Sequence, residues 1–263
     1  IRTFLDDGLT LAEAVVGGPE ALRQNPLVAC YINVTTGLLH NQEALQKLLY
    51  LAEKGLPLLY VPVASGGMTG PVTPAGSMAL VNDGVLAGLV LSQLKREGAP
   101  FIVPGWGGEG LDMRTMVGPY CAPDARGMAQ ELAHYYNLPF FGLAGASEAK
   151  LVDTQAGAEA ALTLLVDTLS GANLIHDLGY LESGLTFSLA QLVICDEIVS
   201  WLKHFMAGVE INDETLALDL IDQVGPDGQY LDTEHTRAHF RERWYPRVFE
   251  RDNYSNWRAK GGK

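Results

Sequence analysis

The chain has 263 residues, of which 48% are hydrophobic and 19% are charged, and its formal net charge is −13 at pH 7. This length suffices for one large α/β domain or two small ones. Eight of the 18 Lys and Arg residues lie between residues 237 and 263, against three acids, so residues 1–236 carry 28 acids and ten bases. Such an acidic body repels polyanions, and we therefore expect no nucleic-acid partner.

Neither a membrane span nor a secretory signal is expected. The longest apolar stretches are interrupted by Gly, Pro, Asp or Lys well before 18 residues, and residues 1–20 contain acids and glycines where a signal needs an apolar stretch. The three cysteines, Cys30, Cys121 and Cys195, lack paired spacing, which is typical of reduced thiols in a cytoplasmic protein. A homo-oligomer is compatible with this composition.

A short pattern recurs five times along the chain. Each time a helical stretch ends at Gly or Asn, and an apolar run rich in β-formers follows. The runs begin at Leu27, Leu58, Phe101, Phe140 and Asn173. Continuous apolar runs are typical of strands buried on both faces, and their spacing leaves room for a helix each time. The sequence therefore predicts a parallel β/α repeat, in which functional residues lie in the loops after the strands.

Helices are predicted between and after these strands. The expected ranges are 1–24, 41–54, 73–97, 123–136, 154–170, 185–205, 212–224 and 233–249. A closed parallel barrel needs eight strands, and only five are present. From the residues alone, the fold is either an open doubly wound sheet or part of a (β/α)8 barrel.

Polar and aromatic residues follow the first, third and fifth predicted strands. The substrate-binding candidates are Asn33, Thr35, Trp106, Asp112, Arg114 and Tyr120. Asp112 and Arg114 either pair with each other or contact a ligand. Trp106 and Tyr120 flank the same loop, and aromatic faces near acids suit a quaternary ammonium group through cation–π attraction. Ordinary packing explains either aromatic residue equally well.

His176 and Asp177 form the strongest candidate for catalysis, because they end a buried strand. A histidine there can act as an acid, a base or a hydrogen-bond donor to a carboxylate. A histidine bonded to a neighbouring backbone carbonyl is the alternative interpretation.

Other reaction classes leave weaker signals. Gly105, Gly107 and Gly110 match the spacing of the dinucleotide fingerprint, but about a dozen loop residues separate Gly110 from the next predicted helix. The fingerprint requires that helix to begin directly. No GxSxG, HExxH or CxxC motif occurs, so neither a serine nucleophile nor a metal site is expected.

Several long segments resemble the trimethylamine methyltransferase family. They are residues 173–205, PVTPAG at 71–76, LDMRT at 111–115, and residues 214–251 from ETLAL to RVFER. The likeness extends through essentially the whole chain. The family fold is a TIM barrel and its members are longer than this chain, so the resemblance implies a C-terminal half. Residues 1–207 would hold about five of the eight β/α units of a (β/α)8 TIM barrel, and residues 208–263 would be a C-terminal helical extension packing on it.

The resemblance also implies a reaction. Family members transfer a methyl group from a methylated amine to the Co(I) cobamide of a separate corrinoid protein, so this chain itself is expected to bind no cofactor tightly. Archaeal members carry pyrrolysine, whereas this sequence is more similar to the non-pyrrolysine branch, whose substrates include quaternary amines such as glycine betaine. The catalytic pair would then be His176 and Asp177. Two alternatives stay open: an unrelated nucleotide-dependent α/β oxidoreductase, and a non-catalytic fragment or homologue that acts as a binding subunit.

Overall fold

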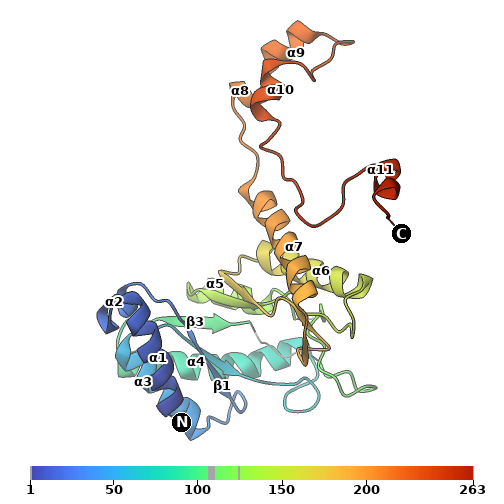
Figure 1. The fold of residues 1–263 in the computed structure, drawn as a ribbon. Helices are drawn as coiled ribbons and strands as arrows, with labels where there is room; N and C mark the ends of the chain where they lie inside the picture. Colours follow the sequence, from blue (N-terminus) through green and yellow to red (C-terminus); the bar gives the residue numbers. More distant parts are fainter. Residues whose placement is uncertain (1, 106–109, 124, 263) are drawn as a thin grey trace. The chain divides into compact units, whose positions relative to one another are not determined.

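The computed structural model describes residues 2–105, 110–123 and 125–262 (Figure 1). The chain divides into two compact units, one ending at Leu192 and the other beginning at Val193. Helix α7 (Leu189–Ala207) contains this boundary. Each unit is described by itself below.

The first unit is built on a five-stranded parallel sheet. Its strands are β1 (Cys30–Val34), β2 (Leu58–Pro62), β3 (Phe101–Pro104), β4 (Phe140–Leu143) and β5 (Leu174–His176). Their order in the sheet is β1-β2-β3-β4-β5, and every neighbouring pair is parallel. The prediction of five parallel strands in an α/β fold is therefore confirmed.

Four helices connect the five strands in turn. They are α3 (Gln42–Lys54), α4 (Pro74–Lys95), α5 (Met128–Tyr136) and α6 (Thr154–Leu169). A doubly wound sheet reverses its strand order at a switch point, and this sheet does not. Right-handed crossovers in an unreversed order place all the connecting helices on one face. The strand order therefore argues against the doubly wound alternative and leaves one face of the sheet without crossover helices.

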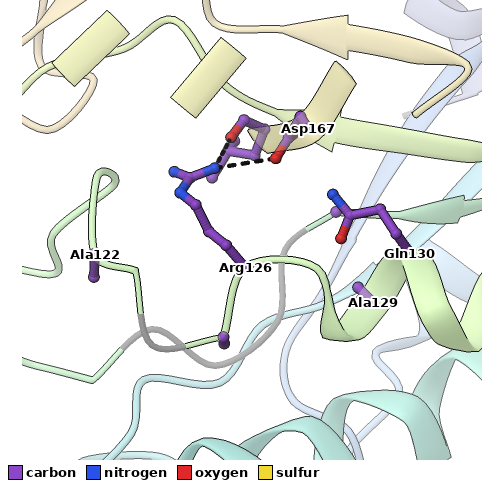
Figure 2. Close-up of a pocket in the computed structure, with 8 residues that line it drawn as sticks. Ala122, Arg126, Ala129, Gln130 and Asp167 are labelled. Carbon is purple, nitrogen blue, oxygen red and sulfur yellow. Dashed lines mark hydrogen bonds and ion pairs between the residues drawn. The ribbon is translucent and has the colours of Figure 1, made fainter. Parts of the chain in front are cut away.

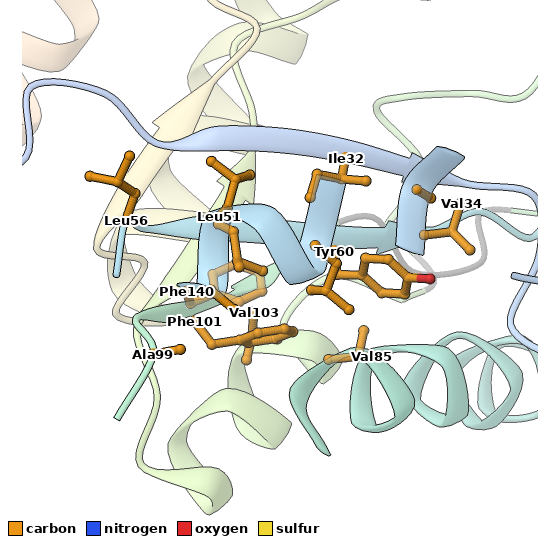
Figure 3. Packing of buried hydrophobic residues seen from close by; sticks show 14 of the residues in the cluster. Ile32, Val34, Leu51, Leu56, Tyr60, Val85, Ala99, Phe101, Val103 and Phe140 are labelled. Carbon is orange, nitrogen blue, oxygen red and sulfur yellow. The ribbon is translucent and has the colours of Figure 1, made fainter. Parts of the chain in front are cut away.

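Alternate strand residues form the core beneath the helices (Figure 3). Ile32, Tyr60 and Phe140 are almost fully buried in one cluster with Leu51 and Val85 from the helices. Burying an aliphatic or aromatic side chain of this kind stabilises the fold by about 1.5–3 kcal/mol. The Tyr60 hydroxyl keeps a partner, because it lies 2.9 Å from Nδ1 of His40, and burial raises the pKa of Tyr60 to about 12.

The sheet is strongly curled, and the face opposite this core lies inside the curl. The ring centroids of Tyr31 in β1 and His176 in β5 are 6.1 Å apart, and Phe141 in β4 lies 4.2 Å from His176 and 6.2 Å from Tyr31. In a flat sheet, strands four positions apart would be separated by about 19 Å. The sheet therefore bends until side chains of its first and last strands meet. Tyr31 nevertheless stays 43% exposed.

Three predicted elements of the first unit differ from the structure, each for a local reason. The helix expected over 1–24 is two helices, α1 (Arg2–Val16) and α2 (Pro19–Gln24), because Gly17 and Gly18 adopt positive φ angles of 95° and 128°. Helix α5 begins at Met128 instead of 123, after Gly127 at φ 87°.

Helix α7 also begins later in the chain than predicted. A hairpin of β6 (Tyr180–Leu181) and β7 (Thr186–Phe187) occupies residues that were predicted as a loop and the start of a helix, so α7 begins at Leu189. Strands of two residues carry too little apolar pattern to be predicted.

The second unit consists of most of α7 and four short helices. They are α8 (Asp213–Leu216), α9 (Leu218–Val224), α10 (Glu234–His239) and α11 (Tyr254–Ala259). Ala217, at φ 49°, divides the helix expected over 212–224. The helix expected over 233–249 ends at His239, in keeping with Pro246, which disfavours helix at and before its own position. The following segment is fixed on α7 instead, since the Glu197 carboxylate accepts the Arg247 amide over 2.6 Å.

Helix α4 departs from the expectation that no segment could span a membrane. Within the described parts of the chain, it is the one helix long and apolar enough to do so by length and composition. Its packing offers another explanation, because Met78, Val81 and Val85 are buried in the core beside β2. Gly88 also packs closely on β2, since a Cβ there would lie 2.4 Å from the Tyr60 ring. We interpret α4 as a core helix.

Two helical glycines provide a matched test of this packing. Gly88→Ala should destabilise the protein by about 1–3 kcal/mol, because its methyl group would displace the buried Tyr60 ring. Gly157→Ala in α6 should stabilise it by about 0.4–1 kcal/mol, since a Cβ there meets nothing within 4 Å. Thermal unfolding of both variants measures the difference. Equal shifts of the melting temperature would contradict the close packing of α4 on β2.

Candidate functional site

Backbone hydrogen bonds link loops that follow neighbouring strands, and we call the loops after the five strands the rim. Because all five strands are parallel, their carboxyl ends lie at the same edge of the sheet. The loops after β2 and β3 are joined by the bond from the Leu111 amide to the Gly66 carbonyl, 3.0 Å. Those after β4 and β5 are joined by the bond from the Ser147 amide to the Tyr180 carbonyl, also 3.0 Å. The loops after four of the five strands are thus linked in two pairs.

His176 is held in a defined orientation at the end of β5. Its Nδ1 lies 2.7 Å from Oδ1 of Asp177, and its ring stacks on Phe141 with an interplanar angle of 16°. An ionised carboxylate can only accept, so Nδ1 carries the proton in this pair. Nε2 forms no hydrogen bond to any residue that the structure describes. The neutral ring therefore offers the Nε2 lone pair, and the imidazolium form would offer an N–H.

Backbone strain is concentrated just after β5. Asp177 has φ 77°, and the turn of the β6–β7 hairpin contains Glu182 at 52°, Ser183 at 53° and Gly184 at 81°. Left-handed backbone at a non-glycine residue costs on the order of 1–3 kcal/mol, and it persists where surrounding contacts impose it. Here the Ser183 hydroxyl donates to Oε2 of Glu148 over 3.0 Å. Strain of this kind gathers at functional sites, which supports the choice of this region.

Asp112 and Arg114 form a pair within the loop after β3. Nε and Nη2 of Arg114 lie 3.1 and 2.9 Å from the two carboxylate oxygens of Asp112, and the Arg114 amide bonds to the same group. The guanidinium beside it lowers the pKa of Asp112 to about 2. The Arg114 side chain is 88% exposed. The sequence allowed Asp112 and Arg114 either to pair with each other or to contact a ligand, and the structure shows them paired with each other.

The remaining candidates occupy separate places on the rim. Asn33 and Thr35 are exposed at and beyond the end of β1, and Thr35 Oγ1 lies 3.4 Å from Oδ1 of Asn41. Tyr120 is half-buried, with its ring next to Gly184. Trp106 lies outside the described residues, as does Gly107 of the glycine motif. No helix begins directly after Gly110, and α5 starts only at Met128, so the dinucleotide fingerprint lacks its required context.

Four residues near this rim were missed by reasoning from the sequence. Tyr31 and Phe141 are strand residues whose alternation suggested only packing, yet they meet His176 on the curled face. Glu148 follows β4, and its carboxylate accepts hydrogen bonds from the Cys121 amide and Ser183 hydroxyl. A carboxylate a few residues beyond a buried strand was the available signal for Glu148. Arg126, the fourth, gave no such signal, because its partners are distant in sequence.

Arg126 enters a small buried cavity beside β4 (Figure 2). Its Nη1 lies 2.8 Å from the Leu143 carbonyl and 3.3 Å from Oδ1 of Asp167, whose side chain is 2% exposed. Burial raises the pKa of Asp167, and the guanidinium acts in the opposite direction. The cavity measures about 20 Å³, which fits one water molecule. It is too small for an organic substrate.

Cys121 is the cysteine closest to the rim, and its environment suppresses nucleophilic reactivity. Its thiol lies 3.1 Å from the Ala146 carbonyl, and burial together with the Glu148 carboxylate raises the thiol pKa well above its ordinary value. Within residues 2–105, 110–123 and 125–262, no group of three or more His, Cys, Asp or Glu side chains is arranged to hold a metal ion.

Comparison with known proteins gives consistent matches. The family model described as trimethylamine methyltransferase (MTTB) matches residues 3–263. The chain is 37% identical to a trimethylamine methyltransferase MttB of Desulfitobacterium hafniense, over 97% of this chain and 52% of that protein. It is 33% identical to a glycine betaine methyltransferase of the same species, over 96% and 53%. It is also 33% identical to a trimethylamine methyltransferase MttB of Methanosarcina thermophila, again over 96% and 53%. The chain thus spans about half the length of these curated relatives.

The Asp112–Arg114 pair predicts a pH dependence that can be measured. The folded pKa of Asp112 lies below its ordinary value of 3.8, so the pair's contribution to loop order is present above pH 3.8 and is lost as the pH falls towards about 2. The Asp112 carboxyl carbon should show almost no NMR titration between about pH 5 and pH 3. In Arg114→Ala its midpoint should rise towards 3.8, while the backbone amide of residue 114 still bonds to the carboxylate. Arg237→Ala, which breaks a similar exposed pair with Glu234, is the control that leaves Asp112 unchanged. A wild-type midpoint near 3.8 would contradict the pairing.

Proposed function

Since the chain belongs to the trimethylamine methyltransferase family, we propose that it forms part of an enzyme that transfers a methyl group from a methylated amine. The family match over residues 3–263 supports this proposal, as do relatives named as trimethylamine and glycine betaine methyltransferases. The glycine spacing at Gly105, Gly107 and Gly110 was the one signal for a nucleotide-dependent oxidoreductase, and among the described residues no helix begins directly after Gly110.

The structural half of the proposal concerns the barrel. We infer that the five β/α units are the second part of a (β/α)8 barrel, of which residues 208–263 form a C-terminal helical extension. A sheet with sequential parallel strands, helices on one face and strong curl has the geometry of a barrel segment. In the described part of the chain, β1 pairs only with β2 and β5 only with β4. The chain's coverage of about half of its relatives leaves enough sequence for three more units.

The observation that carries the proposal is the position of His176. It lies at the end of the edge strand β5, on the curled face, with its orientation set by Asp177 and by stacking on Phe141. In a barrel this face is the interior, and the carboxyl ends of the strands form the mouth where substrates bind. Tyr31 and Phe141 would then form an apolar floor below the amine. Such a floor excludes water and presents aromatic surface to a trimethylammonium group.

A quaternary amine fits this environment better than a tertiary one. A quaternary nitrogen leaves as a neutral amine, so transfer of its methyl group needs no acid to activate the leaving group. The negative charge of Asp177 suits the cation. The carboxylate of glycine betaine would accept a hydrogen bond from His176 in its imidazolium form or from Arg114, which would have to exchange part of its pairing with Asp112.

The methyl acceptor is expected to be the cobamide of a separate corrinoid protein, and when bound it supplies a strongly nucleophilic Co(I). Exposed apolar side chains on the rim fit the approach of such a partner. Met68 follows β2, while Met113 and Met116 follow β3, and these side chains are 60%, 55% and 64% exposed. Methionines are common at adaptable binding surfaces. We further propose a cytoplasmic location, because a reduced acceptor requires a reducing compartment.

Substitution of His176 tests the site in the complete protein. His176→Ala should weaken substrate interaction by about 1.5–3 kcal/mol, the range for a hydrogen bond to a charged group. This corresponds to a roughly 10- to 150-fold loss of apparent affinity. The measurement is methyl transfer from glycine betaine, and in parallel from trimethylamine, to Co(I) cobalamin, followed by the corrinoid absorbance.

His204→Ala is the matched control, since His204 is exposed on α7 in the second unit. It should keep the wild-type rate and affinity. Wild-type behaviour of both His176→Ala and Arg114→Ala would show that the two residues are structural and that the amine binds elsewhere.

A further inference from the structure

One peptide group in the loop after β3 is held from both sides by charged side chains. The Tyr120 carbonyl accepts a hydrogen bond from Nη2 of Arg126. The Cys121 amide, which belongs to the same peptide unit, donates to Oε1 of Glu148 over 3.1 Å. Hydrogen bonds to ionised groups are roughly twice as strong as those between neutral groups. We call this peptide with Arg126 and Glu148 the Tyr120–Cys121 clamp.

Both charged residues of the clamp are tied to the framework of the first unit. Arg126 is 13% exposed and also bonds to the carbonyl of Leu143, the last residue of β4. The Glu148 amide donates to Oε2 of Glu159 in α6 over 2.8 Å. The clamp therefore fixes the loop relative to the end of β4 and to α6. Contacts within the loop alone could not do this.

The clamp also fixes the Tyr120 side chain against the strained turn after β5. A Cβ placed on Gly184 would lie 3.3 Å from the Tyr120 ring, so ring and turn are in close contact. The second oxygen of Glu148 accepts the Ser183 hydroxyl over 3.0 Å. Glu148 thus bonds to both segments that meet around Tyr120, the loop on one side and the turn on the other.

We propose that Arg126 and Glu148 are positioning residues for the amine site, and that they act by holding the Tyr120 ring where it meets the ammonium group of the substrate. This inference rests on the proposed function, because Tyr120 can contact the amine only if the protein binds one. Long loops without regular structure lose much conformational freedom on ordering. A clamp made before the substrate arrives removes that penalty from binding.

A double-mutant cycle tests whether Glu148 acts through Tyr120. The readout is the dissociation constant of glycine betaine, measured by calorimetry on the complete protein without the corrinoid partner. Glu148→Ala should raise it roughly 10-fold, and Glu148→Gln, which keeps an acceptor for the Cys121 amide, should restore most of the affinity. In a Tyr120→Ala background, Glu148→Ala should change the constant less than about twofold, because coupled residues are not additive.

Hydrogen exchange provides a readout that is independent of binding. Glu148→Ala and Arg126→Lys should both increase deuterium uptake in residues 111–121, since each loosens one side of the clamped peptide. Arg96→Ala is the matched control, because Arg96 likewise donates to a backbone carbonyl, that of Glu53 over 2.9 Å, outside the rim. It should leave both the uptake of residues 111–121 and the betaine affinity unchanged.

The outcomes separate the two proposals. Wild-type betaine affinity in Glu148→Ala, or an effect of equal size with and without Tyr120, would overturn the positioning role. If Glu148→Ala does not fold, Arg126→Lys with and without Tyr120→Ala carries the same comparison. A wild-type protein that binds neither glycine betaine nor trimethylamine contradicts the proposed function, and with it the role of the clamp at an amine site. Unchanged exchange in the variants would show that the clamp does not hold the loop at all.

Discussion

The curl of the five-stranded sheet is the constraint on which the rest of the structure depends. A flat sheet would hold β1 and β5 about 19 Å apart, yet the rings of Tyr31 and His176 lie within 6.1 Å. The unreversed strand order puts the helices outside this curl, and it leaves aromatic side chains inside. The carboxyl ends of the strands then meet around a common centre, which is the condition for residues far apart in sequence to form one site.

Hydrogen bonds between the rim loops hold the candidate residues in defined positions. Side-chain bonds to backbone groups link the loops after β3, β4 and β5, as when Glu148 accepts the Cys121 amide and Ser183 hydroxyl. The left-handed backbone at Ser183 lies where its hydroxyl donates to Glu148. Strands and helices thus bring the candidate residues to the same edge, and charged side chains of the loops set their orientation.

Sequence patterns predicted the strands well, because each is a continuous apolar run with a helix on either side. The adjacent pair His176–Asp177 could be identified for the same reason, since its position follows directly from the end of β5. Helix ends were less predictable where a single residue with positive φ decides them, as at Gly127 and Ala217. The contacts of Arg126 could not be predicted, because its partners Leu143 and Asp167 are brought to it only by the completed fold.

We propose that the curled face of this sheet lines the amine site of a closed barrel. The most direct measurement is a crystal structure of the complete protein with glycine betaine bound. We expect further strands to pair with the outer edges of β1 and β5, and the ammonium group to lie above Tyr31 and Phe141 within reach of His176. Solvent on those strand edges, or betaine bound away from His176, would contradict it.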